Sequence, residues 1–312
     1  MKDFAGKIAV ITGGGTGMGR ELARALSAEG CSVAMCDVSE ANMAETQRLC
    51  LAAAPQGTAV STFRADVAIE AEMNAFADAV RAEFDTDRIH LLFNNAGVAG
   101  GGSFVAGDRA AWERTFAICF YGVIHGVRAF LPLLKNAHEA RIVNTSSVNG
   151  FWATLGPDRP HTAYSAAKFA VKGFTEALQE DLAMHAPQIT CSVVMPGHIG
   201  TEIVGNSMRI QGGVSDEMNF AQEEPGADSA TLSEDQMIEL ANAGFRDTAP
   251  MSSAEAAKVI LDGVRAGKWR ILVGKDAEFL DQQVRADPEN AYTPEFTKKL
   301  HAGGHFMSIT GG

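Results

Sequence analysis

The first two thirds of the chain alternate short apolar runs with longer amphipathic segments, and this alternation restricts the fold more than any other feature. Six runs rich in β-branched residues are separated by segments whose apolar residues recur every three or four positions. This pattern is typical of βαβ units, in which helices cover both faces of a parallel sheet. The predicted strands are 7–12, 31–37, 58–66, 89–95, 140–147 and 189–196, and the predicted helices are 17–29, 40–53, 69–84, 109–135 and 162–186.

A seventh apolar run, 270–274, follows a helical pattern over 252–266 and is predicted to form the far edge of the sheet. We therefore predict an α/β fold of the Rossmann type, with a doubly wound, seven-stranded parallel sheet flanked by helices. Neither an internal repeat nor a break in composition divides the 312 residues. The expectation is a single domain over 1–312.

Two segments depart from the alternation. Residues 205–249, after the sixth predicted strand, combine Gly, Asn, Ser, Asp and Glu with scattered apolar residues, over a length unusual for a connection. We predict a partly helical lid that orders over bound substrate, and the alternatives are a disordered insertion or a static lobe. Residues 276–312 form a C-terminal extension that either packs on a neighbour or is loose.

The net charge argues against two classes of partner. There are 26 Lys and Arg against 38 Asp and Glu, which gives a net charge of −12, and no block of basic residues. Nucleic acids and acidic membrane surfaces bind clustered positive charge, so we expect neither as a partner. Apolar runs are interrupted before the roughly 18 residues of a membrane span, so no transmembrane segment is predicted.

Cysteine and histidine usage indicates a reducing compartment and no metal. The cysteines are odd in number and show no CxxC spacing. The N-terminus lacks the apolar region of a secretion signal, so we expect a cytoplasmic protein. The histidines form neither an HExxH motif nor a cluster with cysteines, and no metal site is predicted. The cysteines are Cys31, Cys36, Cys50, Cys119 and Cys191.

A glycine-rich turn, TGGGTGMG at 12–19, follows the first predicted strand and opens the first helix. Glycines there let the backbone approach a diphosphate, which free N–H groups and the positive helix end would hold. Glycine also suits any tight strand-to-helix turn, but the position after the first strand favours a dinucleotide. The expected cofactor contacts in this turn are Gly13, Gly15, Thr16, Gly17, Met18 and Gly19.

Asp37 ends the second predicted strand, about 20 residues after the glycine-rich turn. A carboxylate at this place accepts hydrogen bonds from the adenosine ribose hydroxyls and repels a 2′-phosphate. Neither Thr16 nor Val38, which would lie beside it, is basic. We therefore predict NAD as the cofactor, and the alternative is that Asp37 only caps the next helix.

Tyr164 and Lys168 form a YxxxK motif at the start of a predicted helix. Residues four apart lie on one helix face, so the two side chains are expected to be neighbours. A nearby ammonium favours the phenolate and lowers the tyrosine pKa from about 10 toward a useful range. This pair predicts a tyrosine that works as a general acid and base.

Taken together, these motifs resemble the short-chain dehydrogenases/reductases, in the single-domain branch with the TGxxxGxG turn. The resemblance covers about residues 5–275 and implies an NAD-dependent oxidoreductase that interconverts a hydrophobic secondary alcohol and its ketone. It also implies a homodimer or homotetramer. The residues that carry it, in order, are TGGGTGMG (12–19), Asp37, Asp66-Val67, Asn94-Asn95-Ala96-Gly97, Ser146-Ser147, YSAAK (164–168), Pro196-Gly197 and Thr201.

The resemblance implies a role for individual residues. Tyr164 would be the general acid and base, Lys168 would bind the nicotinamide ribose, and Ser147 rather than Ser146 would hydrogen-bond the substrate oxygen. The other implied cofactor contacts are Asp66 and Val67 at the adenine, and Asn94, Ala96, Gly97, Pro196, Gly197, Ile199 and Thr201. The expected substrate contacts besides Ser147 and Tyr164 are Asn149, Phe151, Trp152, His198, Ile203 and Met208, and the extra residues 151–160 should bulge beside the cleft.

Cys119 departs from the family pattern, because it stands where an asparagine usually holds a water behind the lysine. A thiol is a weak donor and acceptor, so catalysis is expected to be weakened or rerouted, unless a kinked helix offers the main-chain carbonyl instead. Cys119 is either a reactive nucleophile or a buried packing residue. A dinucleotide-binding sensor or scaffold with little turnover is the alternative function. A cofactor-independent lyase would leave the glycine-rich turn and Asp37 without a role.

Overall fold

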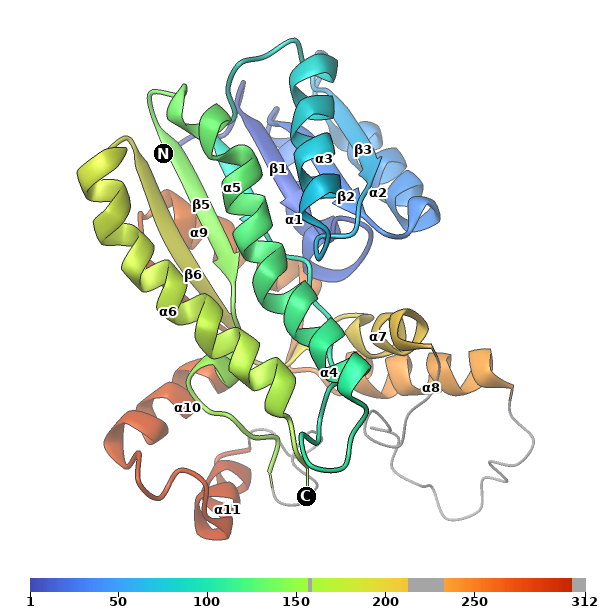
Figure 1. Cartoon of the computed structure of the whole chain (residues 1–312), viewed down its shortest axis with the longest axis vertical. Helices are drawn as coiled ribbons and strands as arrows, with labels where there is room; N and C mark the ends of the chain where they lie inside the picture. The colour runs from blue at the N-terminus through green and yellow to red at the C-terminus, as the bar shows by residue number, and fades with distance from the viewer. Residues whose placement is uncertain (157–158, 213–232, 305–312) are drawn as a thin grey trace.

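The computed structural model describes residues 1–156, 159–212 and 233–304. Seven parallel strands form one sheet in the order β3-β2-β1-β4-β5-β6-β9, so the predicted Rossmann-type sheet and its far edge strand are confirmed (Figure 1). The strand order reverses between β1 and β4, and ligands of such sheets bind at the carboxyl ends beside this point. The strands are β1 (Ile8–Thr12), β2 (Ser32–Asp37), β3 (Val60–Arg64), β4 (Leu91–Asn94), β5 (Ala140–Thr145), β6 (Ile189–Pro196) and β9 (Arg270–Val273).

Helices cover both faces of the sheet and bury two apolar cores. Successive strand residues point to opposite faces, so Val10 belongs to one core and Ile11 to the other. On one face lie α3 (Glu70–Glu83), α5 (Gly122–Lys135) and α6 (Thr162–His185), and on the other α1 (Gly17–Ala28), α2 (Glu40–Ala53) and α9 (Ser253–Arg265). The apolar spacing of the sequence predicted five of them to within a few residues, and α5 is the second half of the predicted helix 109–135.

The predicted helix 109–135 has an irregularity that the sequence pattern does not show. It consists of α4 (Arg109–Phe116), one π-helical turn at Ala117–Tyr121, and α5. The stretch Arg109–Lys135 is long and apolar enough to span a membrane by length and composition alone, and about half of it is buried. Because Ile118 and Phe130 pack in the sheet core, it is a core helix of this fold.

Part of the predicted lid is helical and stands beyond the carboxyl ends of the strands (Figure 1). α7 (Ile203–Gln211) packs against α8 (Glu234–Asp247), and the short strands β7 (Ile199–Gly200) and β8 (Met251–Ser252) pair beside them. A capping box at Ser233 fixes the start of α8. Residues 213–232 of the predicted lid lie outside the described residues, and its ordering on substrate stays a prediction.

Residues 276–304 of the C-terminal extension pack on the rest of the chain, whereas the sequence suggested a neighbour or a loose tail, and residues 305–312 lie outside the described residues. α10 (Lys275–Ala286) and α11 (Pro294–Ala302) enclose an apolar cluster with the loop after β5. Trp152 of that loop is 2% exposed, and its ring contacts the ring of Phe296 at a centroid distance of 6.1 Å. The extension therefore reaches the neighbourhood of the predicted substrate contacts.

Candidate active site

The glycine-rich turn forms one wall of a cavity of about 590 Å³ at the strand-order reversal. A Cβ atom added to Gly13 would lie 2.8 Å from the Cα of Ala96, and one added to Gly17 would lie 3.2 Å from the side chain of Thr201. Both glycines also have positive φ angles, of 67° and 54°, which other residues rarely adopt. Side chains at these places would fill the cavity, so the turn fits the backbone approach that a dinucleotide needs.

Other predicted members of the turn shape it instead of facing the cavity. Thr16, Gly17 and Met18 line the cavity with Gly13, whereas Gly15 and Gly19 are absent from its lining. The N–H of Gly15 donates to Asp37, and a Cβ on Gly19 would collide with the carbonyl of Gly13. These two glycines are therefore required by the turn itself.

Asp37 lines the cavity from the end of β2. Its Oδ2 accepts from the N–H of Gly15 and its Oδ1 from the N–H of Ser39, both at 3.0 Å. The cap of α2 is Ser39, whose hydroxyl accepts from Asn42, so Asp37 does not serve as the helix cap. A carboxylate has about four acceptor positions, and two of them remain for ribose hydroxyls.

Asp66 and Val67, the predicted adenine contacts, line the cavity, and so does Arg114, which the sequence analysis missed. The Arg114 guanidinium forms an ion pair with Asp66 at 2.5 Å. The other Asp66 oxygen accepts from the N–H of Ala68 at 3.0 Å. Arg114 lies on α4, far away in sequence, and no motif marks it.

Asn94, a predicted cofactor contact, does not line the cavity. Its side chain is 2% exposed and donates to Asn144 of the neighbouring strand β5, whereas Asn95, Ala96 and Gly97 line the cavity. Asn95 donates to the carbonyls of Thr12 and Gly13 and so ties the end of β4 to the glycine-rich turn. The alternation of side chains along a strand explains the difference, because neighbours point to opposite sides.

The loop after β6 closes the other end of the cavity. Thr201 lines it, as does Ile203 at the start of α7, whereas Pro196 ends β6 and Ile199 is buried in the sheet core. Asn206 of α7 also lines the cavity, and its side chain donates to the hydroxyl of Thr16 at 2.9 Å. The first helix of the predicted lid therefore contacts the glycine-rich turn directly.

Ser147, Tyr164 and Lys168 come together at the carboxyl end of β5 and the start of α6. A side-chain hydrogen bond joins Tyr164 to Ser147, and the Lys168 ammonium lies 5.3 Å from the centre of the tyrosine ring. The Lys168 Nζ donates to the carbonyl of Thr145 at 2.9 Å and faces Gly97 of the cofactor cavity. Ser146, by contrast, donates its hydroxyl to the Lys168 carbonyl at 2.7 Å, so its hydroxyl forms a structural hydrogen bond.

Burial shifts the pKa values of Tyr164 and Lys168 in opposite directions. Desolvation raises the pKa of Tyr164 above its ordinary value, and the hydrogen bond from Ser147 opposes this rise. Desolvation lowers the pKa of the Lys168 ammonium. Burial therefore disfavours the charged form of both side chains. Perturbed pKa values of this kind are common where a side chain gains or loses a proton during a reaction.

Cys119 lies in the π-helical turn, behind Lys168. It is completely buried, and its Sγ donates to the carbonyl of Val98 at 3.3 Å. This environment favours the packing interpretation, because a reactive cysteine needs access to solvent. The π turn is the kind of helix irregularity that the sequence analysis required for a main-chain carbonyl to replace the asparagine, and that replacement stays a prediction.

A second, smaller cavity of about 90 Å³ lies beside Ser147 and Tyr164, and Ile203 lines both cavities. Of the predicted substrate contacts, Asn149, Trp152, His198 and Ile203 line it. It is otherwise mainly apolar, and the residues that the sequence analysis did not assign to it include Val148, His161 and Val204. Trp152, Thr154 and Leu155 come from the extra residues after Ser147, which lie beside the cleft as predicted.

Two predicted substrate contacts, Phe151 and Met208, line neither cavity. Phe151 packs on the C-terminal cluster and lies under the guanidinium of Arg270, 5.7 Å from its ring centre. Met208 is 1% exposed and packs between α7 and α8. Both are apolar residues near the site in sequence, and their orientation is set by packing that the sequence pattern does not reveal.

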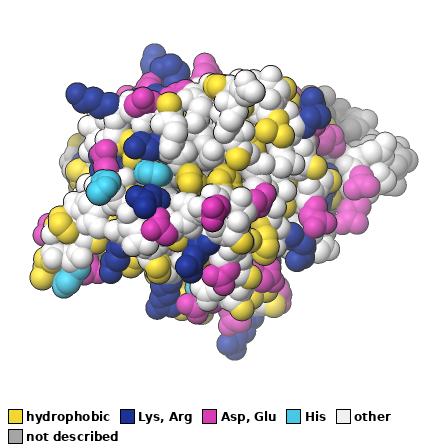
Figure 2. All heavy atoms as spheres, turned by 90° about the horizontal axis from the view of Figure 1, so that it is seen from above, with side chains coloured by type: hydrophobic (Ala, Val, Ile, Leu, Met, Phe, Trp, Pro, Cys, Tyr) yellow, Lys and Arg dark blue, Asp and Glu magenta, His cyan; other side chains and the backbone are white. Residues whose placement is uncertain are grey.

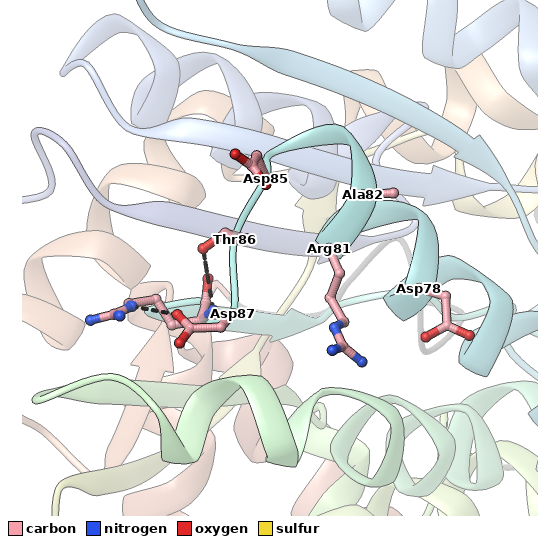
Figure 3. Close-up of a pocket in the computed structure, with 7 residues that line it drawn as sticks. Asp78, Arg81, Ala82, Asp85, Thr86 and Asp87 are labelled. Carbon is pink, nitrogen blue, oxygen red and sulfur yellow. Dashed lines mark hydrogen bonds and ion pairs between the residues drawn. The ribbon is translucent and has the colours of Figure 1, made fainter.

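A wide depression of about 720 Å³ lies at the opposite, amino end of the sheet, at the end of α3. Figure 2 shows this face, on which basic and acidic side chains are interspersed. In Figure 3, Arg81 and Asp78 border the depression, and the neighbouring Asp87 forms an ion pair with Arg88 at 2.8 Å. It lies away from the glycine-rich turn and has mixed charge, so it is not the candidate active site.

Comparison with known proteins agrees with this geometry. The family model for short chain dehydrogenases matches residues 7–211. SadH of Mycobacterium tuberculosis is 38% identical over 288 residues, which cover 91% of this chain and 92% of the relative. Levodione reductase of Leifsonia aquatica is 32% identical over 66% of this chain and 74% of its own.

Solved structures of short-chain dehydrogenases/reductases are similar to this chain. A short-chain dehydrogenase/reductase from Burkholderia phymatum, in complex with NAD, has a TM-score of 0.74 and 30% identity over 94% of this chain and 98% of its own. A metagenomic short-chain oxidoreductase in complex with NADP has a TM-score of 0.55 and 29% identity over 62% of this chain and 83% of its own. The chain belongs to the short-chain dehydrogenase/reductase family of oxidoreductases.

Proposed function

We propose that this protein is an NAD-dependent oxidoreductase that interconverts a hydrophobic secondary alcohol and its ketone. The observation that carries the proposal is that Ser147 and Tyr164 line the small apolar cavity, while the neighbouring Lys168 faces Gly97 of the large cavity. A dinucleotide in the one and an apolar substrate in the other would meet at the tyrosine. Proximity of this kind accounts for much of the rate of two-substrate enzymes.

The protein side of the reaction is proton transfer and positioning. During oxidation, Tyr164 takes the hydroxyl proton of the alcohol, and during reduction it returns a proton to the ketone oxygen. Ser147 holds that oxygen beside the phenol, and the Lys168 ammonium stabilises the phenolate. The nicotinamide supplies the hydride acceptor or donor, while Gly13, Thr16 and the residues after β4 hold the dinucleotide.

NAD is preferred to NADP in this proposal, because Asp37 stands at the expected ribose position. A phosphate there would bring two negative groups together, and Arg114 is already paired with Asp66. Relatives bind either cofactor, since one solved neighbour holds NAD and another NADP. The preference therefore depends on this chain's own carboxylate.

The test is NADH formation, followed by absorbance, with a panel of alicyclic and aryl secondary alcohols and with both NAD and NADP. The proposal expects turnover with NAD and much weaker turnover with NADP. Tight NADH binding without turnover of any compound would instead support a dinucleotide-binding sensor. Loss of both binding and turnover would reject both functions.

We also propose that the protein is a cytoplasmic homodimer or homotetramer, with neither a nucleic acid nor a membrane as partner. A row of contacting aromatic rings runs along α4 and the π turn, and Tyr121 at its end is 49% exposed. Phe169 on the adjacent α6 is 42% exposed. An exposed aromatic surface on two neighbouring helices suits a two-fold interface between copies of the chain.

A further inference from the structure

The polar side chains of the small cavity differ in how their hydrogen bonds are satisfied. Asn149 donates to two carbonyls of the loop that follows it, at 2.9 and 3.0 Å, and Thr154 bonds to the backbone of its own turn. The His198 ring donates to a carbonyl of α8 at 2.7 Å, and Ser147 and Tyr164 bond to each other. Each of these side chains already has a protein partner.

His161 is different. It is the N-cap residue of α6, three positions before Tyr164, and its ring lies 4.7 Å from the tyrosine ring centre to centre. It lines the small cavity at 9% exposure, and within 1–156, 159–212 and 233–304 its ring nitrogens make no hydrogen bond. A buried polar group without a hydrogen bond lowers the stability of the fold. The presence of the unpaired His161 imidazole in this cavity therefore indicates that a bound ligand is its hydrogen-bond partner.

The imidazole is neutral at ordinary pH, because burial lowers the pKa of His161 to about 4. A neutral imidazole has one N–H donor and one acceptor nitrogen, which suit a hydroxyl or a carbonyl oxygen. It does not suit a carboxylate, since the lining of this cavity contains no lysine or arginine to pair with a buried negative charge.

We propose that His161 hydrogen-bonds a second, neutral oxygen of the substrate, so that the preferred substrate is a hydrophobic alcohol or ketone with another hydroxyl or carbonyl group. This inference rests on the proposed function. The contact of the His161 and Tyr164 rings puts the second oxygen within one small ring or chain of the reacting carbon. His161 then distinguishes substrates by a polar group in a cavity that otherwise selects for apolar shape.

The test compares cyclohexanol with cyclohexane-1,2-, 1,3- and 1,4-diol in the wild-type protein, His161→Phe and His161→Gln. We expect at least one diol to exceed cyclohexanol about tenfold in kcat/KM, as one added hydrogen bond predicts. His161→Phe keeps a ring against Tyr164 and should reduce the ratio of the diol kcat/KM to the cyclohexanol kcat/KM to about one. His161→Gln keeps polar atoms and should restore part of the preference.

Two controls separate this inference from the proposed function. The inference is overturned, while the function stands, if the wild-type protein oxidises cyclohexanol and every diol equally well. It is also overturned if His161→Phe keeps the preference for the diol. A preference for a hydroxycyclohexanecarboxylate would also overturn it. If no compound is oxidised, calorimetric titration in the presence of NADH decides: tighter diol binding by wild type than by His161→Phe supports the site, and equal binding rejects it.

Discussion

At the scale of single residues, Asp37 combines a structural and a selective role. Its two oxygens hold the N–H groups of Gly15 and Ser39, and the same carboxylate faces the large cavity. Replacing it therefore affects the shape of the glycine-rich turn as well as the charge at the ribose position. The two effects are separable in part, because asparagine removes the charge and keeps one of the two acceptor oxygens, whereas alanine removes both oxygens.

We predict that Asp37→Asn narrows the preference for NAD over NADP by about tenfold or more, since the repulsion of a 2′-phosphate is lost. The measurement is kcat/KM with each cofactor. Asp37→Ala is the control: it removes the turn contacts as well, so it should raise KM for both cofactors. Comparable efficiencies with NAD and NADP in the wild-type protein would contradict the role of Asp37.

The pH dependence of the reaction follows from Tyr164. Oxidation needs the phenolate, and desolvation raises the tyrosine pKa, so kcat/KM for oxidation should rise as the pH increases toward that pKa. Reduction needs the phenol, so its rate should fall over the same interval. Lys168→Met removes the positive charge near the phenol, so the rising limb for oxidation should move upward by about one unit or more. A pH–rate profile unchanged by Lys168→Met would show that the ammonium does not act on the tyrosine.

The residues of the catalytic group could be predicted from the sequence because they lie in short motifs. Tyr164 and Lys168 are one helical turn apart, and Ser147 follows a strand end. Arg114 was missed because it reaches its cavity by a tertiary contact, and His161 was missed because no motif marks a histidine three residues before the tyrosine. Asn94 was expected to face the cavity and does not line it, because a strand end does not reveal which of two neighbouring residues faces a cavity.

At the scale of elements, the C-terminal extension holds the loop that borders the small cavity. The indole N–H of Trp152 donates to the carbonyl of Ala291 at 2.7 Å, and the hydroxyl of Tyr292 accepts from the N–H of Ala153 at 3.2 Å. Asn149, which lines the small cavity, donates to the carbonyl of the same Trp152. The extension is thereby connected to the substrate side of the site.

We predict that Trp152→Phe destabilises the fold by about 1 to 3 kcal/mol, because it leaves the buried carbonyl of Ala291 without its donor. The wall of the small cavity should also loosen, so KM for substrate should rise while KM for NAD stays unchanged. Thermal unfolding and steady-state kinetics measure the two effects. Trp269→Phe is the matched control, since Trp269 is 44% exposed, and an equal loss in both variants would refute the connection.

The strands and the six main helices were predictable because each buries a regular apolar pattern. The π turn at Ala117–Tyr121 was not, because one extra residue in a helical turn leaves the apolar spacing almost intact. The helices α10 and α11 were missed as well. Their apolar residues, such as Leu280 and Phe296, complete a core with Trp152, and this partner became visible only in the folded chain.

At the scale of the whole molecule, the large cavity lies at the strand-order reversal, and α7 lines one of its sides. The aromatic surface lies on α4, the π turn and α6, and its exposed members Tyr121 and Phe169 line neither cavity. The net charge of −12 keeps copies apart at long range and is screened at short range by salt. Apolar contact is therefore the expected force in assembly.

We predict a dimer or tetramer by light scattering at micromolar concentration, and a lower mass for the double variant Tyr121→Glu with Phe169→Glu. Two carboxylates buried in an apolar interface would have no cationic partners. Circular dichroism should show an unchanged fold. Leu240→Glu is the control, because Leu240 is 53% exposed on α8 and away from this surface. A wild-type monomer, or a double variant of unchanged mass, would exclude this interface.

The central claim is that Tyr164 transfers the proton in an NAD-dependent oxidation, and Tyr164→Phe tests it most directly. The substitution keeps the ring that packs on His161 and removes only the hydroxyl. NADH binding, measured by calorimetry, should be unchanged, and the rate of NADH formation with the best alcohol should fall by at least ~10²-fold. Turnover within a few-fold of wild type at equal NADH affinity would contradict the claim.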